Sequence, residues 1–316
     1  MVNRGIENIG KIGILMGGIS REREISLKSG NAVKAALENL NYAIAEIDFS
    51  HSDEMIEKIK KSDVDCIFNA LHGSFGEDGQ VQKILDALKI PYTGSGVNAS
   101  RLAIDKTVSH KIFKANGLVV PDYRIPSQYD KIDDQFYSAF PLVVKPAREG
   151  SSIGLFIVEN LDSLDWAINE AAKIDNKLIV EKYIKGRELT VGILDEQALP
   201  VIEVIPKNKF YDFEAKYTQG MTEYIIPANI GRTLTEKIQN VALTAHKLIG
   251  CSCFSRVDII LNEDNVPVVL EINTIPGLTA TSLLPKAAAF AGINFSQLCL
   301  KMIDSAMLKY KDKILT

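Results

Sequence analysis

The stretch VVLEINTIPG, residues 268–277, places two polar side chains inside an apolar run that is typical of a buried strand. Successive side chains on a strand point to opposite faces, so Glu271 and Asn273 share one face, while Leu270 and Ile272 share the other. A buried carboxylate is costly unless a cation or hydrogen-bond donors compensate it. Taken alone, the pair is explained more simply as a solvent-facing strand surface, because glutamate is mostly exposed in proteins.

A second strand, FSRVDIIL at 254–261, precedes this stretch, and the turn residues NEDN between the two predict a β-hairpin. A continuous apolar side requires that these residues share one face: Val257, Ile259, Leu261, Val266, Val268, Leu270 and Ile272. The opposite face then carries Arg256, Asp258, Glu271 and Asn273. Carboxylate and amide oxygens, without His or Cys, are ligands that suit Mg²⁺, which completes its coordination with phosphate oxygens and water. The hairpin therefore predicts a metal site formed by Asp258, Glu271 and Asn273.

Such a metal ion implies a nucleotide, so phosphate-binding groups are expected elsewhere in the chain. In VVKPAREGSSIG (143–154), Lys145 ends an apolar strand, and the Gly/Ser turn after it frees backbone N–H groups to surround phosphate oxygens. No G-K-[ST] follows, so this is not a Walker loop. In LIVEKYIKGREL (178–189), carboxylates and strand-end backbone can contact an adenine edge and ribose hydroxyls. Each segment by itself is more simply a solvated loop.

The composition is that of an ordinary globular protein. The chain has 316 residues, is 46% hydrophobic and 24% charged, and carries a formal net charge of −4. This length indicates two or three domains, and the balance of charge does not favour nucleic acid or an anionic membrane. The four cysteines form no C-x-x-C pair and show no zinc spacing. No apolar run is long enough for a signal peptide or a membrane helix, so we expect a cytoplasmic protein.

The first third of the chain alternates strands and helices. Strands are expected at 11–16, 42–49 and 64–71, and helices after the GGIS turn, around 55–60 and at 81–90. This rhythm predicts a doubly wound parallel sheet, with the loops MGGIS and LHGSFGEDG at the ligand-binding ends of its strands. After a helix at 99–116, seven short strands predict antiparallel sheets. Further helices are expected near 161–173, 232–249 and 294–311. The fold class is therefore α/β followed by α+β.

One segment, residues 207–228, interrupts this pattern. It reads KNKFYDFEAKYTQGMTEYIIPA and is polar and rich in aromatic residues. A loop of this length inside a compact domain is usually a lid or a binding loop. A β-hairpin with an irregular turn is the alternative.

Eight motifs occur in a fixed order: GGISREREIS, ALHGSFGEDGQVQ, PYTGSGVNASRLAIDK, PLVVKPAREGSSIG, EKYIKGRELTVGIL, FYDFEAKY, SRVDIIL and LEINTIPGLTATSLLP. Together they resemble the D-alanine–D-alanine ligases of the ATP-grasp superfamily along nearly the whole chain. In that family, ATP phosphorylates the carboxylate of one D-alanine, and the amine of a second attacks the acyl phosphate. The resulting dipeptide is used for peptidoglycan precursors.

The resemblance implies an N-terminal α/β domain at 1–100 and two ATP-grasp subdomains at 101–188 and 189–316. It also implies a homodimer, ATP, and two Mg²⁺ or Mn²⁺ ions held by the predicted hairpin ligands. For the nucleotide it implies Lys106 and Lys145 as phosphate contacts and Glu188 as the ribose contact. The strand that contacts adenine corresponds to Glu181, Lys182, Tyr183 and Ile184. In the long loop, Lys216 would reach the γ-phosphate.

For the substrates, the resemblance implies that Glu22 receives the ammonium group of the first D-alanine, with His72 nearby. Arg256 and the Gly277 backbone would stabilise the oxyanion of the tetrahedral intermediate. Ser282 and Leu283 would hold the carboxylate of the second D-alanine at a helix start. The loop would be latched by hydrogen bonds among Tyr217, Ser151 and Glu22.

Two positions depart from the common family pattern: Tyr183 stands where Trp is frequent, and Ile275 where Ser or Met is frequent. Tyr217 is typical of the members that form the dipeptide, because relatives that make the D-lactate ester lack a Tyr there. A ligase that uses D-lactate or D-serine as second substrate remains the alternative. A dinucleotide-dependent oxidoreductase is disfavoured: Asp48 ends the second strand, but G-x-G-x-x-G is missing. A regulator without catalysis is disfavoured because every catalytic position is filled.

Overall fold

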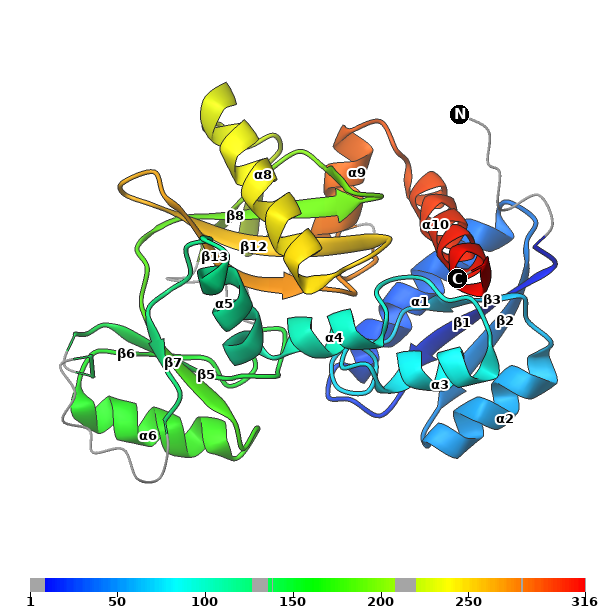
Figure 1. The fold of residues 1–316 in the computed structure, drawn as a ribbon, viewed down its shortest axis with the longest axis horizontal. Helices are drawn as coiled ribbons and strands as arrows, with labels where there is room; N and C mark the ends of the chain where they lie inside the picture. The colour runs from blue at the N-terminus through cyan, green and yellow to red at the C-terminus, as the bar shows by residue number, and fades with distance from the viewer. Residues whose placement is uncertain (1–8, 127–135, 138, 208–219, 280, 316) are drawn as a thin grey trace.

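The computed structural model describes residues 9–126, 136–137, 139–207, 220–279 and 281–315 (Figure 1). These residues form three β-sheets, one parallel and two antiparallel. The predicted succession of an α/β region and an α+β region is confirmed. Residues 208–219 of the loop predicted at 207–228 lie outside the described residues. Within the described part, Thr222–Ile225 form a strand that pairs with Ile202–Pro206, so the loop prediction is wrong there and the alternative of a β-hairpin holds.

The first sheet is parallel, with the strand order β2-β1-β3. Its central strand is buried on both faces from residue 12 to residue 17, which requires cover on both sides. The strands are β1 (Lys11–Gly17), β2 (Ala43–Phe49) and β3 (Cys66–Asn69). The helices that follow them along the chain are α1 (Arg23–Glu38), α2 (Ser52–Ser62) and α3 (Gln80–Leu88).

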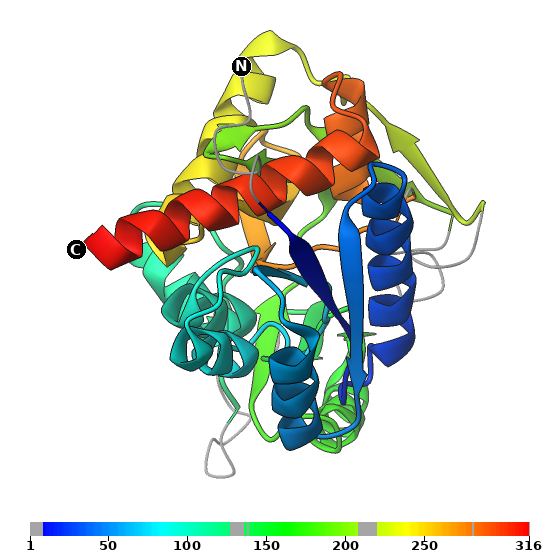
Figure 2. The same cartoon turned by 90° about the vertical axis from the view of Figure 1, so that its right-hand side faces the viewer.

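Part of the cover of this sheet comes from the last helix, α10 (Phe295–Leu315). It packs against α1 and β3, and Figure 2 shows it crossing the sheet. Ile14 of β1 and Phe68 of β3 belong to the same core cluster as Leu298 and Met302 of α10. The first and last segments of the fold therefore share one hydrophobic core.

The second sheet is antiparallel and has the order β4-β7-β5-β6. One helix packs on it, and Leu142, Val144 and Val180 of the sheet share a core cluster with Leu164 and Ala167 of that helix. The strands are β4 (Tyr123–Arg124), β5 (Leu142–Pro146), β6 (Phe156–Val158) and β7 (Leu178–Lys182). The helix is α6 (Leu161–Ala172).

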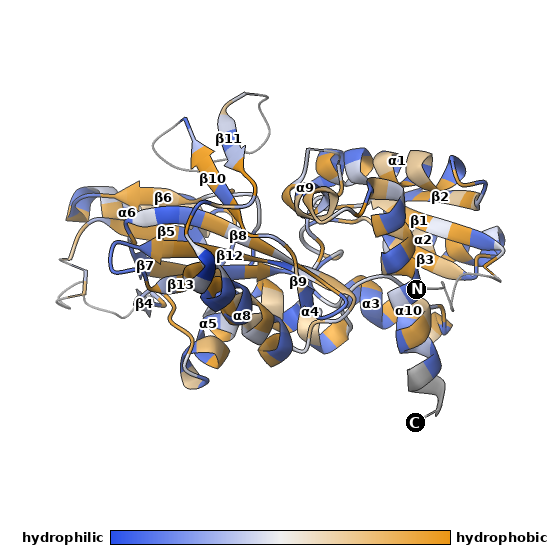
Figure 3. Cartoon of the chain, turned by 90° about the horizontal axis from the view of Figure 1, so that it is seen from above, coloured by the Kyte–Doolittle hydropathy of each residue, from blue (hydrophilic) through white to orange (hydrophobic). Residues whose placement is uncertain are grey.

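The third sheet is also antiparallel, with the path β11-β10-β8-β12-β13 and β9 paired to β8. Its strands are β8 (Gly186–Leu194), β9 (Gln197–Ala198), β10 (Ile202–Pro206), β11 (Thr222–Ile225), β12 (Phe254–Asn262) and β13 (Pro267–Asn273). Its helices are α8 (Arg232–Ile249) and α9 (Leu283–Phe290). Figure 3 shows that hydrophobic residues predominate along β8 and β12, whereas the helices alternate between polar and apolar positions.

The single helix expected at 99–116 is wrong, because the chain forms two helices there, α4 (Val97–Ile104) and α5 (Lys106–Ala115). Asp105 lies between them in an extended conformation, and its carboxylate accepts hydrogen bonds from the backbone N–H groups of Thr107 and Val108. This is an N-cap, which starts a new helix. The break places Lys106 in the first turn of α5.

The predicted hairpin is present, but its strict alternation is not. Asp258 pairs with Glu271, while the next residue, Ile259, pairs with Val269, so Leu270 is an extra residue in β13. Such a β-bulge moves the side chains beyond it to the other face. The predicted apolar side is therefore wrong at Leu270, Val268 and Val266, and Val269 instead shares the buried face with Ile259. The shared polar face before the bulge is confirmed.

Among the described residues, no helix is long and apolar enough to cross a membrane.

Candidate active site

Two adjoining cavities lie among the three sheets. The smaller, of about 400 Å³, is lined by α1, the loop after β3, the turn after β5 and the start of α9. The larger, of about 520 Å³, is lined by the second and third sheets. Lys106, Glu149 and Glu271 line both cavities and so mark their common border.

The larger cavity contains every described residue that the sequence assigned to nucleotide binding. These residues are Lys106, Lys145, Glu181, Lys182, Tyr183, Ile184 and Glu188. Apolar side chains form opposite parts of its wall, with Val143 and Ile157 from the second sheet and Ile260 and Leu270 from the third. A flat apolar ring fits between such walls, with polar groups available at its edge.

At this edge, Lys145 and Glu181 form a buried ion pair with 2.8 Å between the ammonium nitrogen and the carboxylate. The two residues lie on the neighbouring strands β5 and β7. Both side chains are less than a tenth exposed, and burial of an ion pair is tolerated only when each charge has a partner. The pairing fixes one ammonium and one carboxylate at a set place in the cavity wall.

At the common border, the Lys106 ammonium donates to the carbonyl of Glu149 (2.8 Å) and lies 3.2 Å from the Glu271 carboxylate. Burial alone would lower the pKa of Lys106, but the charge and hydrogen bond of Glu271, together with the charges of Glu181 and Glu77, outweigh it and raise the pKa. Lys106 is therefore held as a cation. Burial also raises the pKa of the Glu149 carboxyl. Glu149 was not identified from the sequence, although it borders the Gly/Ser turn.

The proposed metal ligands share one face of the hairpin, where Asp258 is opposite Glu271 and Arg256 is opposite Asn273. Arg256 binds Asp258 in a bidentate manner (2.8 and 2.7 Å), and the Thr190 hydroxyl donates to the same carboxylate at 2.7 Å. Asn273 uses its side-chain oxygen to accept from the Ile275 backbone N–H. Among the described residues, no three His, Cys, Asp or Glu side chains form a metal cluster.

The donor set is nevertheless chemically suited to Mg²⁺. Magnesium is usually bound through one or two carboxylates and takes its remaining ligands from phosphate oxygens and water. Asp258 and Glu271 supply two carboxylates on directly paired residues, and both line the larger cavity. Each carboxylate already has a cationic partner in the protein, Arg256 or Lys106. The residues therefore fit a metal that arrives together with phosphates.

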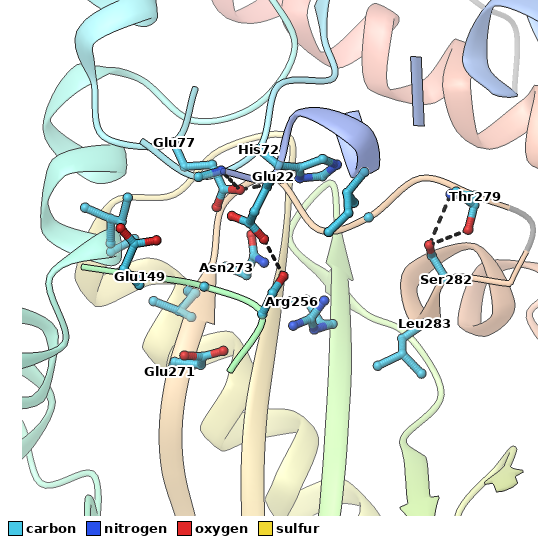
Figure 4. Close-up of a pocket in the computed structure, with 18 of the residues that line it drawn as sticks. Glu22, His72, Glu77, Glu149, Arg256, Glu271, Asn273, Thr279, Ser282 and Leu283 are labelled. Carbon is cyan, nitrogen blue, oxygen red and sulfur yellow. Dashed lines mark hydrogen bonds and ion pairs between the residues drawn. The ribbon is translucent and has the colours of Figure 1, made fainter. Parts of the chain in front are cut away.

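In the smaller cavity, Glu22 and Ser151 come from different parts of the chain and meet through a hydrogen bond from the Ser151 hydroxyl to the Glu22 carboxylate (Figure 4). Glu22 is only 6% exposed, and it is the residue immediately before α1. Ser151 has a left-handed backbone (φ 53°) in the turn after β5, which brings that turn against Glu22. A carboxylate at this depth suits a ligand ammonium group.

His72 takes part in a second network at this cavity. Its Nε2 lies 3.0 Å from the Ser29 hydroxyl, and that hydroxyl oxygen accepts from the Leu278 backbone N–H. Nδ1 faces the Glu77 carboxylate at 3.4 Å, and a carboxylate accepts, so a neutral imidazole carries its proton on Nδ1 and Nε2 accepts from the Ser29 hydroxyl. Burial raises the pKa of Glu77, and the hydrogen bond with His72 opposes this rise. Glu77 and Ser29 were not identified from the sequence.

Ser282 and Leu283 form another part of the wall of the smaller cavity. Ser282 lies immediately before α9, and Leu283 is the first residue of that helix. The Ser282 hydroxyl accepts from the Thr279 backbone N–H (3.1 Å) and contacts the Thr279 hydroxyl at 2.8 Å (Figure 4). A side chain at Gly277 would come within 3.0 Å of the Ser282 hydroxyl, so the backbone approaches closely here. Gly277, Ser282 and Leu283 all line the smaller cavity with Arg256.

Three residues that were considered for ligand binding from the sequence are not placed in either cavity. Lys216 and Tyr217 lie outside the described residues. Asp48, the residue that could have bound a dinucleotide ribose, is engaged in a bidentate ion pair with Arg23 (2.7 and 2.6 Å). The Arg23 hydrogen bond and charge lower the pKa of Asp48. This pair, not a ligand site, explains the acidic residue near the end of β2.

Comparisons with known proteins agree along nearly the whole chain. The family model for the D-ala D-ala ligase N-terminus matches residues 48–95, and that for the C-terminus matches residues 112–304. A D-alanine–D-alanine ligase of Trichlorobacter lovleyi is 46% identical over 301 residues, covering 95% of this chain and 96% of the relative. One of Geobacter sulfurreducens is 44% identical, covering 95% of each.

Solved structures give the same result. The D-alanine–D-alanine ligase of Bacillus anthracis complexed with ATP superposes with a TM-score of 0.86 at 35% identity, covering 96% of this chain and 99% of that one. The VanG D-Ala:D-Ser ligase of Enterococcus faecalis gives a TM-score of 0.80 at 30% identity, covering 94% and 99%. The chain therefore belongs to the D-alanine–D-alanine ligase family.

Proposed function

We propose that this enzyme joins two D-alanines into D-alanyl-D-alanine with ATP, through an acyl phosphate, and supplies peptidoglycan precursors. Its ATP-grasp fold was expected from the motifs. The observation that carries the proposal is the common border of the two cavities, where Lys106 and Glu271 face both the nucleotide side and the amino-acid side. A phosphoryl group passes between substrates at such a border, where a fixed cation stabilises its charge.

On the nucleotide side, the apolar walls of the larger cavity hold the adenine, and the strand from Glu181 through Lys182 and Tyr183 to Ile184 contacts its edge. Glu188 binds the ribose, and Lys145 and Lys106 contact the phosphates. Lys216 of the loop would add a contact to the γ-phosphate. Asp258, Glu271 and Asn273 would hold Mg²⁺ or Mn²⁺, two ions in all. When bound, the metal neutralises the charge that gathers on the phosphate oxygens.

On the amino-acid side, Glu22 binds the ammonium of the first D-alanine, and its position depends on Ser151 and, by resemblance, on Tyr217. His72 lies at the same side of the cavity. Arg256 and the Gly277 backbone stabilise the oxyanion that forms when the second amine attacks. Ser282 and Leu283 orient the carboxylate of the second D-alanine at the start of α9.

The same proposal includes the setting in which the enzyme works. We place it in the cytoplasm, where ATP is supplied, and as a homodimer, which sedimentation analysis can test. We also divide the chain at the sheets into units 1–100, 101–188 and 189–316. Since β8 already begins at Gly186, the second boundary is better placed before that strand.

The decisive experiment follows ADP formation with D-alanine, D-serine or D-lactate as second substrate, in the presence of ATP and Mg²⁺. D-serine is included because VanG, a relative, is named for its use. We expect the highest kcat/KM with D-alanine, and mass spectrometry should identify D-alanyl-D-alanine. Faster turnover with D-serine or D-lactate would replace the proposed second substrate, and no ADP formation with any of them would refute the proposed reaction.

A further inference from the structure

A buried serine of α1 lies behind the smaller cavity and joins two parts of its wall. Ser29 is completely buried and does not line the cavity itself. Its hydroxyl contacts the imidazole of His72, in the loop after β3, and the backbone N–H of Leu278, in the loop after β13. These partners are 43 and 249 positions away in the sequence. Ser29 therefore connects the first sheet with the loop that leaves the third sheet.

The chemistry of the two partners sets the direction of both hydrogen bonds. A backbone N–H can only donate, so the Ser29 oxygen accepts from Leu278 at 3.3 Å. The hydroxyl proton of Ser29 is then available to Nε2 of His72, 3.0 Å away. The other ring nitrogen, Nδ1, faces the Glu77 carboxylate. The result is a directed chain of donors and acceptors that runs from Leu278 through Ser29 to His72.

The loop that Ser29 holds carries two of the groups assigned to the second D-alanine and its attack. Gly277, whose backbone is the proposed oxyanion donor, directly precedes Leu278. The loop continues to Ser282, whose hydroxyl accepts from the Thr279 backbone N–H (Figure 4). A Cβ at Gly277 would come within 3.0 Å of that hydroxyl, so this segment is folded closely on itself. The hydrogen bond from Leu278 to Ser29 is therefore made inside the segment that places both groups.

The N-terminal end of the same helix lies next to the proposed ligand of the first D-alanine. Glu22 is the residue immediately before α1, and Ser29 follows it by about two helical turns. Because the helix is rigid, the position of Glu22 is fixed relative to Ser29, and through Ser29 relative to the peptide after Gly277. The contact for the ammonium group and the donor for the oxyanion are thus held at a set separation. A displacement of about 1 Å between such groups can lower a rate about a hundredfold.

We propose that Ser29 is a positioning residue for the attack of the second D-alanine, because its hydroxyl holds the peptide between Gly277 and Leu278 at a fixed place relative to Glu22. Ser29 touches no substrate. It acts through Leu278 on the oxyanion donor and through His72 on the neighbouring wall of the cavity. Transfer of the γ-phosphoryl group, at the common border of the two cavities, does not require it. This inference rests on the proposed function, because it assigns the loop to the tetrahedral intermediate.

The test compares Ser29→Ala and Ser29→Cys with the wild type. Alanine leaves the Leu278 N–H without its acceptor and His72 Nε2 without its donor. Cysteine keeps the shape of the side chain, but its thiol is a weaker donor and acceptor. Ser26→Ala is the matched control, since Ser26 is a buried serine of the same helix that lines neither cavity. Its hydroxyl donates to the Ala70 carbonyl at 2.8 Å.

Two reactions are measured for each variant. Dipeptide formation gives kcat and the KM values for ATP and D-alanine. Positional isotope exchange in ¹⁸O-labelled ATP, with D-alanine present, reports reversible formation of the acyl phosphate. A loss confined to the first measurement is a readout that a general loss of structure would not produce, because the exchange needs the same folded enzyme.

We expect Ser29→Ala to lower kcat for the dipeptide about tenfold, the effect of one lost hydrogen bond in a buried site. Isotope exchange should proceed at least as fast as in the wild type, with KM for ATP unchanged. Ser29→Cys should have an intermediate kcat, and Ser26→Ala should retain the wild-type kcat. Wild-type kcat in Ser29→Ala, or an equal fall of exchange and dipeptide formation, would overturn the inference. If Ser29→Ala does not fold, wild-type kcat in Ser29→Cys would overturn it.

The imidazole of His72 provides a spectroscopic check on the direction of the chain. In protein with ¹⁵N in its four histidines, the unprotonated ring nitrogen of His72 is an acceptor from Ser29 in the wild type. Ser29→Ala should shift this resonance, whereas Ser26→Ala should leave it in place. An unchanged resonance in Ser29→Ala would overturn the assigned contact. The proposed function fails separately, since it requires both isotope exchange and dipeptide formation in the wild type, and the absence of both there would refute it.

Discussion

The ammonium group of Lys106, in the first turn of α5, lies 3.2 Å from the carboxylate of Glu271 on β13, at the border that both cavities share. The two residues are 165 positions apart in the sequence. Each neutralises the other in a largely buried setting, so loss of either one leaves an uncompensated charge. A substrate that carries phosphate and metal has to bind beside two groups, the Lys106 ammonium and the Glu271 carboxylate, that already form an ion pair with each other.

The first prediction concerns Glu271→Gln, which keeps the shape of the side chain but removes the charge that a metal requires. We expect the rate of ADP formation to fall by at least about a hundredfold, because charge on a metal ligand at the reacting phosphate is lost. The control is Glu263→Gln in the turn of the same hairpin, where the carboxylate is exposed and paired with Lys185. Wild-type turnover of Glu271→Gln at saturating Mg²⁺ would remove this residue from the metal site.

The second prediction concerns Glu22→Gln. A charged hydrogen bond contributes about 1.5–3 kcal/mol, so its loss should raise KM for D-alanine at least about tenfold and leave Kd for ATP unchanged. Glu24→Gln is the matched control, since Glu24 lies in the first turn of α1 and is exposed. A parallel loss of ATP affinity would instead indicate that the start of α1 is misfolded.

The third prediction concerns Thr190→Val, a change of nearly equal volume that removes the hydroxyl bound to Asp258. Groups that orient a metal ligand typically change metal affinity by about 10–100-fold when they are lost. We expect the Mg²⁺ concentration for half-maximal activity to rise about tenfold. Thr244→Val on the exposed face of α8 should have no such effect. If the Mg²⁺ dependence of both variants matches the wild type, Asp258 is not oriented by Thr190 for metal binding.

The fourth prediction concerns Asp105, the cap of α5, and the pH dependence of stability. Burial acts to raise the pKa of Asp105, but hydrogen bonds from Lys177 and Thr107 outweigh it and lower the pKa below 3.8. Because the pKa is lowered in the folded state, Asp105 stabilises the protein above pH 3.8, and this contribution is lost as the pH falls through the folded pKa.

Asp105→Asn should therefore lower the free energy of unfolding by about 1 kcal/mol at neutral pH, and the difference from wild type should shrink at acid pH. Urea titrations across this range provide the measurement. Asp122→Asn serves as control, because Asp122 is exposed and its ion pairs with Lys114 and Lys182 are both long, at 3.8 Å. A difference that grows on acidification would contradict the assigned direction of the pKa change.

The first sheet and the hairpin could be predicted because their patterns are local. Alternating strands and helices are visible in the order of the residues, and the shared face of Asp258 and Glu271 follows from the two-residue period of a strand. The break at Asp105 was missed because helix-compatible residues continue on both sides of it. The bulge at Leu270 was missed because an extra residue leaves no mark in an apolar run.

Two of the residues missed in the site, Ser29 and Glu149, have partners far away in the sequence, since Ser29 meets His72 and Glu149 meets Lys106, each 43 positions away. No local pattern distinguishes these two residues from any other polar residue. Lys106 and Ser151 could be assigned only through the family resemblance, for the same reason.

The packing of α10 on α1 and β3 has a consequence for the time course of synthesis. On the ribosome, the residues of the first sheet emerge early, but the helix that covers them begins about 226 residues after β3 ends. At about 5–20 residues per second, translation of that interval takes roughly 10–45 s. Throughout this time, apolar side chains of α1 and β3 remain without their final partner. The nascent chain therefore presents a surface on which a ribosome-associated chaperone can bind, and this surface disappears when α10 docks.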